Sequence, residues 1–256
     1  MDRMNREDVL KETAEILLRG RKVAPLQTLK EEEAPTDLRE VYTVQDAIAR
    51  DFGHVGGWKI GAPSATEEPF FAPMPLAWIV KDGVSLSGER YRLRGVEAEI
   101  AFLVGIDLPA REQGYSREEV AAAMEACVPA IELLESAYVD PRAVPRLTMF
   151  ADLQMHGGFV PGKPIENWQA IDWAAESIDL VIDGKVEMTR TGSNPGGTDL
   201  LRLLTYLANE GAVRTGGLKK GQWITTGSWT GATWLRAGQA AEARFTHGQP
   251  VTIHFA

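Results

Sequence analysis

The sequence predicts an α+β fold in which a small helical N-terminal region, residues 1–53, precedes a mainly β body, residues 54–256. Apolar residues recur at helical spacing through the N-terminal region. Beyond residue 53 the chain changes to short apolar runs separated by Gly and Pro, as expected of strands joined by turns. Asp183-Gly184 lies between two of these runs and is a strong signal for a β-hairpin.

Two helices are expected in the N-terminal region. Apolar residues of the first fall at helical spacing over 9–17, and Gly20 is expected to end it. The second is expected to begin at Thr43, with Asp46 three residues later in a capping-box arrangement, and to end at Gly53.

The body is expected to contain short strands and two helices. Ser116 and Glu119 have capping-box spacing, so a helix should start there and end near Cys127, before Pro129. Gly211 should end the later helix, over residues 198–209. The predicted strands cover residues 58–60, 78–80, 96–104, 130–134, 178–182, 185–188, 223–226, 241–245 and 251–255.

Composition limits the function classes that the chain can belong to. The 256 residues are 44% hydrophobic, which allows a substantial core. The net charge is −9 without a basic stripe, so nucleic-acid binding is not expected. A single cysteine, Cys127, excludes an internal disulfide and suits a reducing compartment. No apolar run approaches the ~20 residues of a membrane span, and the N-terminus lacks a signal-peptide core. We therefore expect a cytoplasmic protein with no membrane partner.

Two glutamates stand in a strand that should be buried on both faces. Over residues 96–104 one face is apolar throughout, and the other begins with Glu97 and Glu99 before it also becomes apolar. Like charges about 7 Å apart at Cα that enter an apolar wall are costly unless a cation neutralises them. A hard divalent metal ion is the simplest such cation.

A third carboxylate is expected beside this pair. Glu132 shares a strand face with apolar neighbours over 130–134 and would also be buried, and Glu135, on the opposite face, is the second choice. Three carboxylates on two strands supply the oxygen ligands that Mg²⁺ or Mn²⁺ prefers, and leave positions for water and substrate. The alternative is that the pair starts its strand at a solvated rim and is neutralised by Arg92 or Arg94.

Three segments stand in an order and at a spacing that together resemble one enzyme superfamily. They are Gly57-Trp-Lys-Ile-Gly61, Val96-Glu-Ala-Glu-Ile100 and Pro129-Ala-Ile-Glu132. The chain resembles the fumarylacetoacetate hydrolase superfamily, specifically its branch of 2-hydroxypentadienoate (2-keto-4-pentenoate) hydratases and 4-oxalocrotonate decarboxylases. Tyr42-Thr-Val-Gln-Asp46 and Gly221-Gln-Trp-Ile-Thr-Thr-Gly227 extend this resemblance over nearly the whole chain. The resemblance implies that the body is a mixed β-roll catalytic domain.

The resemblance also implies roles for particular residues. Glu97, Glu99 and Glu132 match the metal-ligand positions of the family. Lys59 matches the active-site lysine in the family motif Gly-Arg-Lys-x-Gly, in which Trp58 here replaces the arginine. A lysine on this strand could act as an electrophilic or acid–base group.

Two departures from the family pattern concern the substrate pocket. The family's Pro-Asp-Phe/Tyr-Gly stretch corresponds to Glu67-Glu-Pro-Phe-Phe-Ala72, which contains no aspartate. The family's Asp-Asn-x-Ser-x-Gly stretch corresponds to Asp152-Leu-Gln-Met-His-Gly157, where Asp152 and Gly157 persist and His156 appears. We expect His156 and Asp152 to share proton transfer with Lys59, because an imidazole titrates near neutrality.

The resemblance implies a homo-oligomeric enzyme, dependent on Mg²⁺ or Mn²⁺, whose substrate is a small 2-oxo or 2-hydroxy-enoic acid. The favoured activity is a hydratase that adds water to a 2-hydroxy-2,4-dienoate and forms a 4-hydroxy-2-oxo acid, as in aromatic meta-cleavage catabolism. A 2-oxoacid decarboxylase or a C–C hydrolase of a diketo acid would use the same metal site. A catalytically inactive small-acid binding protein of the same fold is the competing class, because several pocket residues of the family are replaced.

Overall fold

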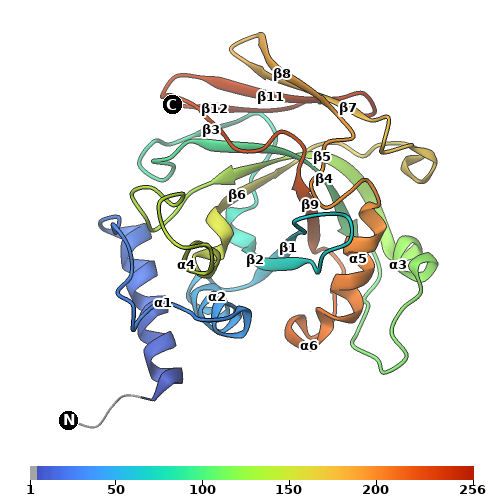
Figure 1. Ribbon diagram of the computed structural model, residues 1–256. Helices are drawn as coiled ribbons and strands as arrows, with labels where there is room; N and C mark the ends of the chain where they lie inside the picture. The colour runs from blue at the N-terminus through green and yellow to red at the C-terminus, as the bar shows by residue number, and fades with distance from the viewer. Residues whose placement is uncertain (1–4) are drawn as a thin grey trace.

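The computed structural model describes residues 5–256 and has the predicted α+β fold, with two β-sheets and flanking helices (Figure 1). Among these residues no helix is both long enough and apolar enough to cross a membrane. The helices are α1 (Arg6–Lys22), α2 (Leu38–Phe52), α3 (Arg117–Ala123), α4 (Arg146–Ala151), α5 (Leu200–Asn209) and α6 (Ala212–Thr215). The strands are β1 (Val55–Gly61), β2 (Phe70–Pro75), β3 (Val84–Leu86), β4 (Gly95–Val104), β5 (Met124–Leu134), β6 (His156–Pro161), β7 (Ser177–Ile182), β8 (Lys185–Thr191), β9 (Trp223–Ser228), β10 (Thr233–Trp234), β11 (Ala240–Phe245) and β12 (Val251–Phe255).

The two sheets lie one over the other (Figure 1). The seven-stranded sheet has the order β2-β1-β9-β4-β5-β6, and β10 pairs with β4 beside this path. The five-stranded sheet has the order β3-β12-β11-β7-β8, and its strands β11 and β12 lie against β5. Strands β7 and β8 form the hairpin that Asp183-Gly184 predicts. Helices α1, α2 and α4 group on one side of the larger sheet, and α3, α5 and α6 on the other (Figure 1).

Strand β4 lies inside the larger sheet and is largely buried on both faces, which confirms the prediction for this segment. It pairs antiparallel with β5 so that Glu97 lies opposite Glu132. It also pairs antiparallel with β9, where Glu99 lies opposite Ser228. The register of three adjacent strands therefore determines where the acidic side chains stand.

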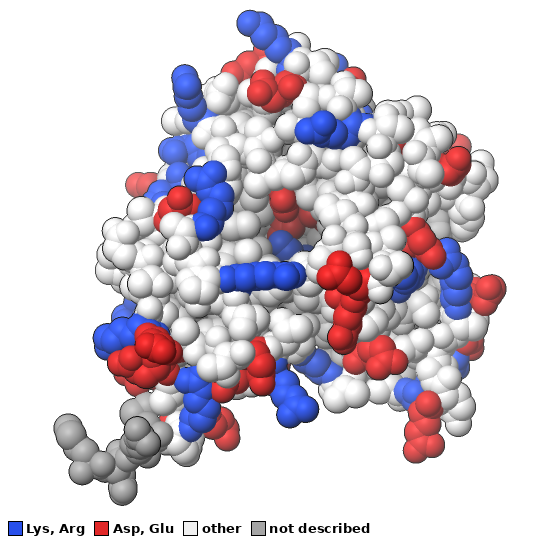
Figure 2. All heavy atoms as spheres, viewed as in Figure 1, with Lys and Arg blue, Asp and Glu red and all other residues white. Residues whose placement is uncertain are grey.

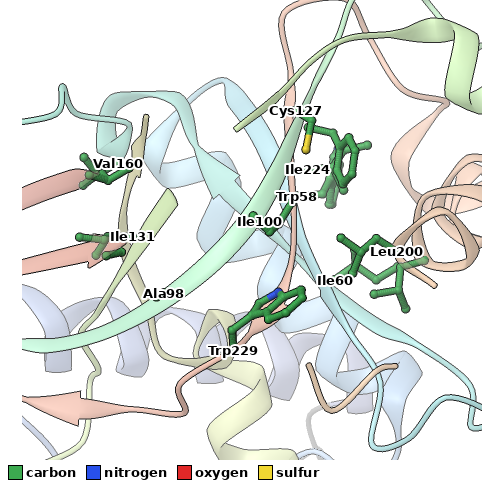
Figure 3. Close-up of a cluster of buried hydrophobic side chains, with 14 of the residues drawn as sticks. Trp58, Ile60, Ala98, Ile100, Cys127, Ile131, Val160, Leu200, Ile224 and Trp229 are labelled. Carbon is green, nitrogen blue, oxygen red and sulfur yellow. The ribbon is translucent and has the colours of Figure 1, made fainter. Parts of the chain in front are cut away.

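Alternate residues of β1 and β4 pack into the main hydrophobic core. Figure 3 shows Ala98 and Ile100 of β4 and Ile60 of β1 in this cluster, each at most 1% exposed. Because successive side chains of a strand point to opposite faces, both glutamates of β4 and Lys59 of β1 point away from this core. The packing of one face thus directs these charged side chains to the other.

The N-terminal helices differ in their bounds from the prediction. Helix α1 does not end at Gly20 but continues to Lys22. Gly20 has a different function: a Cβ there would lie 2.8 Å from the Cβ of Ala137, so glycine permits a close contact. Helix α2 begins at Leu38 rather than Thr43, because the Asp37 side chain accepts a hydrogen bond from the first turn. Both helices precede residue 54, and the domain boundary there stays a prediction.

Two further elements were wrongly predicted. Helix α3 ends at Ala123, and the chain passes directly into β5, so Pro129 lies within a strand and does not break a helix. Proline is tolerated there because only its carbonyl is needed for pairing: it accepts a hydrogen bond from the Gly162 N–H at 2.8 Å, just after β6. The expected strand over 78–80 is replaced by a short 3₁₀ turn, Leu76–Trp78, and the segment after it makes an isolated bridge to β6.

Candidate active site

Three glutamate side chains from β4 and β5 meet at one place. One carboxylate oxygen from each of Glu97, Glu99 and Glu132 lies within 4.8 Å of those from the other two. Glu132 is completely buried, Glu99 is 1% exposed and Glu97 is half-buried. The structure therefore brings together all three residues that were predicted to hold a metal ion.

Glu135, Arg92 and Arg94 do not take part in the acidic cluster but make other contacts. The Glu135 carboxylate accepts hydrogen bonds from the backbone N–H groups of Leu93 (3.0 Å) and Ser136 (2.9 Å), and the Arg92 guanidinium lies 3.4 Å from it. Arg94 donates to the backbone carbonyl of Arg92 at 3.3 Å. The glutamates of β4 are thus not a solvated rim pair neutralised by these arginines.

Two nitrogen groups hold Glu132. Its Oε1 accepts a hydrogen bond from Lys59 Nζ at 2.8 Å and lies 2.8 Å from His156 Nδ1. Lys59 Nζ also donates to the backbone carbonyl of Gln154 at 3.1 Å. Lys59 comes from β1 and His156 from the first position of β6, so side chains of four strands meet in this cluster.

Strand β9 fixes Glu99 from the opposite side. The hydroxyl of Thr225 donates to Glu99 Oε2, and the backbone N–H of Gly227 donates to the same oxygen at 3.1 Å. These bonds hold one Glu99 oxygen in place and leave the other free to serve as a ligand.

The three carboxylates cannot all be ionised without a further cation. Burial raises the pKa of Glu97 to about 7, with Glu132 adding to the effect and Lys59 opposing it. Burial also raises the pKa of Glu99 well above its ordinary value, and both neighbouring glutamates add to this. Burial alone would raise the pKa of Glu132 too, but Lys59 and His156 outweigh it and hold it at about 2. Near neutral pH the cluster therefore retains protons that a divalent cation would displace.

The residues present fit a hard divalent metal ion. Among residues 5–256 no group donates a hydrogen bond to Glu132 Oε2, although this atom is completely buried. A buried carboxylate oxygen normally has a donor or a cation beside it. Oxygen atoms from three carboxylates are the ligand set that Mg²⁺ and Mn²⁺ prefer, so Glu97, Glu99 and Glu132 would hold the ion.

A cavity of about 320 Å³ opens beside the cluster, which is within the range of small-molecule sites. Figure 2 shows one face of the molecule hollowed, with acidic and basic atoms deep in the hollow. The charged end of the cavity is formed by Lys59, Glu97 and Glu99. The remaining wall is mainly apolar and consists of Ile60, Ala62, Pro63, Phe70, Met149, Phe150, Met155 and Pro195, with backbone and polar groups between them.

His156 and Asp152 lie behind the cavity wall rather than in its lining. The His156 ring is completely buried, stacks on Trp78 at 5.8 Å between centroids, and contacts Glu132. Burial lowers the pKa of His156, in spite of the adjacent Glu132 carboxylate. Asp152 is completely buried and pairs with Arg21 at 2.5 Å. The proton-transfer roles expected of these two residues would therefore have to act through other groups.

Three polar residues of the cavity wall were not singled out as site residues. Gln154 is 4% exposed, and within residues 5–256 its amide nitrogen has no hydrogen-bond partner; Ser228 is half-buried, and its hydroxyl lies beside the Glu97 carboxylate. Asn194 precedes α5, whose first turn is capped by the Asp199 side chain. The Asn194 amide donates to the carbonyl of Thr226 at 2.8 Å and closes the cavity beside β9. Gln154 and Asn194 lie outside the strands, so sequence spacing could not place them in the cavity wall, and Ser228 ends β9, where the register with β4 places it opposite Glu99.

Comparisons with known proteins agree with this geometry at the level of the fold. No protein-family model and no curated protein matches the sequence. Among solved structures, 4-oxalocrotonate decarboxylase from Pseudomonas putida G7, complexed with calcium and acetate, is 22% identical, with a TM-score of 0.79 over 99% of both chains. The same enzyme complexed with magnesium and adipate is 21% identical, with a TM-score of 0.80 over 99% of both chains. A fumarylacetoacetate hydrolase family protein from Yersinia pestis CO92 is 18% identical over 78% of this chain and 91% of its own, with a TM-score of 0.56.

The chain has the fumarylacetoacetate hydrolase fold. The superfamily resemblance of the sequence is confirmed at the level of the fold, and the two decarboxylase structures match this chain over 99% of its length. Within the fumarylacetoacetate hydrolase fold, the acidic cluster lies where β4 and β5 pair and the cavity opens over it.

Proposed function

We propose that the protein is a divalent-metal-dependent hydratase that acts on a 2-hydroxy-2,4-dienoate of the 2-keto-4-pentenoate type. The observation that carries this proposal is the convergence of Glu97, Glu99 and Glu132 at one end of a mainly apolar cavity. Bound Mg²⁺ or Mn²⁺ would supply Lewis acidity to the carboxylate and the C2 oxygen of such an acid. The metal identity, a homo-oligomeric state and a cytoplasmic location are parts of the same proposal.

Lys59 is the residue of the cavity wall that can deliver a proton. The attraction of three carboxylates outweighs burial and raises its pKa, so Lys59 is an ammonium group near neutral pH. It would therefore act as a proton donor toward the conjugated chain of the substrate and not as a base. In the overall reaction the 2-hydroxyl becomes a ketone, a hydroxyl group adds at C4, and protons add at C3 and C5.

Buried polar groups would orient the substrate in the cavity. The Gln154 amide nitrogen has no partner among residues 5–256, and Gln154 lines the cavity together with Ser228, whose hydroxyl lies beside Glu97. A buried polar group is stabilised by a hydrogen bond, which an oxygen of the bound acid can provide. His156 would keep Glu132 in position through its bond to Oε1.

The apolar part of the cavity favours a substrate with one carboxylate over a dicarboxylate. Within residues 5–256, Lys59 is the only basic residue of the cavity lining, and it is paired with Glu132. Arg146 lies over the Phe70 and Phe150 rings, at 5.4 and 4.8 Å, but does not line the cavity. A second carboxylate would meet aromatic and methionine side chains without a cation, which is unfavourable.

Substrate turnover tests the proposal directly. The purified protein should consume 2-hydroxypenta-2,4-dienoate with Mg²⁺ or Mn²⁺ and form 4-hydroxy-2-oxopentanoate, and a chelator should abolish the reaction. Release of CO₂ from 4-oxalocrotonate, without hydration of the dienoate, would show that the protein is a decarboxylase and not a hydratase. Cleavage of a diketo acid, without hydration of the dienoate, would show that the protein is a C–C hydrolase.

Calorimetry separates the enzyme from an inactive binding protein. We expect Mg²⁺ or Mn²⁺ to bind the wild type, oxalate to strengthen this binding, and Glu97→Gln to weaken it. Binding of a small acid without turnover of any of the three substrate classes would favour the binding protein. Absence of metal binding by the wild type would contradict the proposed metal site.

A further inference from the structure

A left-handed turn lies directly behind the candidate active site. Leu153, Gln154 and Met155 have φ angles of 50°, 54° and 63° in succession. Residues other than glycine rarely adopt this conformation, and a run of three is retained only when the surroundings hold it. The turn places the Gln154 carbonyl 3.1 Å from Lys59 Nζ, and the side chains of Gln154 and Met155 line the cavity.

One side chain of the N-terminal helix holds both ends of this turn. Arg21 Nε donates to Asp152 Oδ1 at 2.5 Å, and its Nη2 donates to the Asp152 carbonyl at 2.9 Å, just before the turn. Its Nη1 donates to the His156 carbonyl at 2.9 Å, just after the turn. Nη2 also lies within hydrogen-bond distance of the Glu135 carbonyl, at 3.2 Å. The Arg21 side chain is 6% exposed, so these bonds are shielded from water.

Asp152 joins this arginine to the body of the protein. Its Oδ2 accepts hydrogen bonds from the Ser136 hydroxyl at 2.6 Å and from the Ala137 N–H at 2.7 Å. Every oxygen of this carboxylate is therefore used in fixing the segment, and none faces the cavity. The same segment after β5 contacts α1 at Gly20, where a Cβ would lie 2.9 Å from the Ala137 carbonyl.

We propose that Arg21 is a positioning residue, which holds the turn Leu153–Met155 so that the Gln154 carbonyl and the His156 ring bracket Lys59 and Glu132. This inference rests on the proposed function for its effect on turnover. It makes the N-terminal helix a part of the active-site assembly, although Arg21 is not in the cavity lining. The planar guanidinium suits this role because it presents several donors in a fixed geometry, which a lysine cannot reproduce.

The first test compares Arg21→Ala with Arg6→Ala in the metal-free protein. Arg6 is a matched control, because it also lies in α1 and also makes four hydrogen bonds, but to Glu40 and to the carbonyls of Glu32 and Ala34. We expect hydrogen–deuterium exchange to accelerate at residues 152–156 in Arg21→Ala and not in Arg6→Ala. Unchanged exchange of this segment in a folded Arg21→Ala protein would overturn the inference.

The second test uses turnover with metal bound. Arg21→Ala should lower kcat about 100-fold, the scale expected for a small misplacement of catalytic groups, while Mg²⁺ affinity stays within about threefold of the wild type. Guanidinium ion, added to Arg21→Ala at concentrations that leave the protein folded, should restore part of the lost kcat. The Arg21→Lys variant should not have the kcat of the wild type. A kcat loss no greater than that of Arg6→Ala, or absence of rescue in a folded protein, would overturn the positioning role.

The two tests separate this inference from the proposed function. If the wild type shows no metal-dependent turnover, the proposed function fails and the exchange comparison decides the role of Arg21 by itself. If Arg21→Ala does not fold, Arg21→Lys takes its place in the exchange measurement, where it should accelerate exchange at residues 152–156. Wild-type exchange in Arg21→Lys would then overturn the inference.

Discussion

Raising the pH should destabilise the metal-free protein through Glu97. The pKa of Glu97 is raised from 4.5 to about 7 by burial and by Glu132. At a pH between these two values, Glu97 is therefore protonated in the folded protein and ionised in the unfolded chain. The free energy of unfolding therefore falls as the pH rises from about 5 to about 8. A shift of this size corresponds to about 3 kcal/mol at most, and we expect about 1–3 kcal/mol because Glu97 is only half-buried and water screens part of its charge.

Urea denaturation of the chelator-treated protein measures this effect. Glu97→Gln should reduce the loss of stability between about pH 5 and about pH 8 by the same 1–3 kcal/mol, since glutamine is neutral throughout. Glu187→Gln, at an exposed carboxylate of β8, is the matched control and should behave as the wild type. Glu132 does not interfere, because its pKa of about 2 lies below the range. A loss of stability in Glu97→Gln that equals the wild-type loss would refute the reasoning.

The remaining predictions concern the metal and the substrate. Glu99→Gln should weaken Mg²⁺ binding by at least about tenfold in calorimetry, and a variant with wild-type affinity would remove Glu99 from the ligand set. Metal affinity of the wild type should fall at least about tenfold from about pH 8 to about pH 6, because protons compete for Glu97 and Glu99, and a flat profile would contradict the raised pKa values. Lys59→Met should lower kcat by about 10²–10⁴ without loss of metal, as judged by turnover and metal analysis, and unchanged turnover would exclude a proton-donor role. Met149→Arg should improve binding of a dicarboxylate such as adipate relative to a monocarboxylate of equal length, and an unchanged ratio would argue against the apolar wall as the selective element.

The sequence predicts the acidic cluster well because strand alternation and burial are local properties. Glu97 and Glu99 lie two residues apart on one face of β4, and their position in an otherwise apolar segment was sufficient to indicate a metal site. Glu132 could be added for the same reason, but its position directly opposite Glu97 depends on the β4–β5 register, which only the fold defines. The hairpin at Asp183-Gly184 was predicted for a similarly local reason.

The roles of residues outside the strands could not be predicted in this way. Asp152 resembles a pocket residue in sequence, but its carboxylate is taken by Arg21, which lies more than a hundred positions earlier in the chain. No local pattern indicates that pairing, nor the left-handed turn at Gln154, since neither depends on periodicity. Pro129 was misread for the opposite reason: a local helix-breaking signal was outweighed by the pairing of β5 with β4.

The register of β4 and β5 also separates the acidic cluster from the connection between these two strands. Glu97 lies near the start of β4 and Glu132 near the end of β5, so the connection over residues 105–123 joins the two strands at their other ends. Insertions or deletions in the exposed part of that connection, residues 109–113, would leave the ladder, and hence the carboxylates, in place. A shift of one residue within either strand would instead turn a glutamate to the opposite face. The fold can thus acquire new surface features at this connection without moving the acidic cluster.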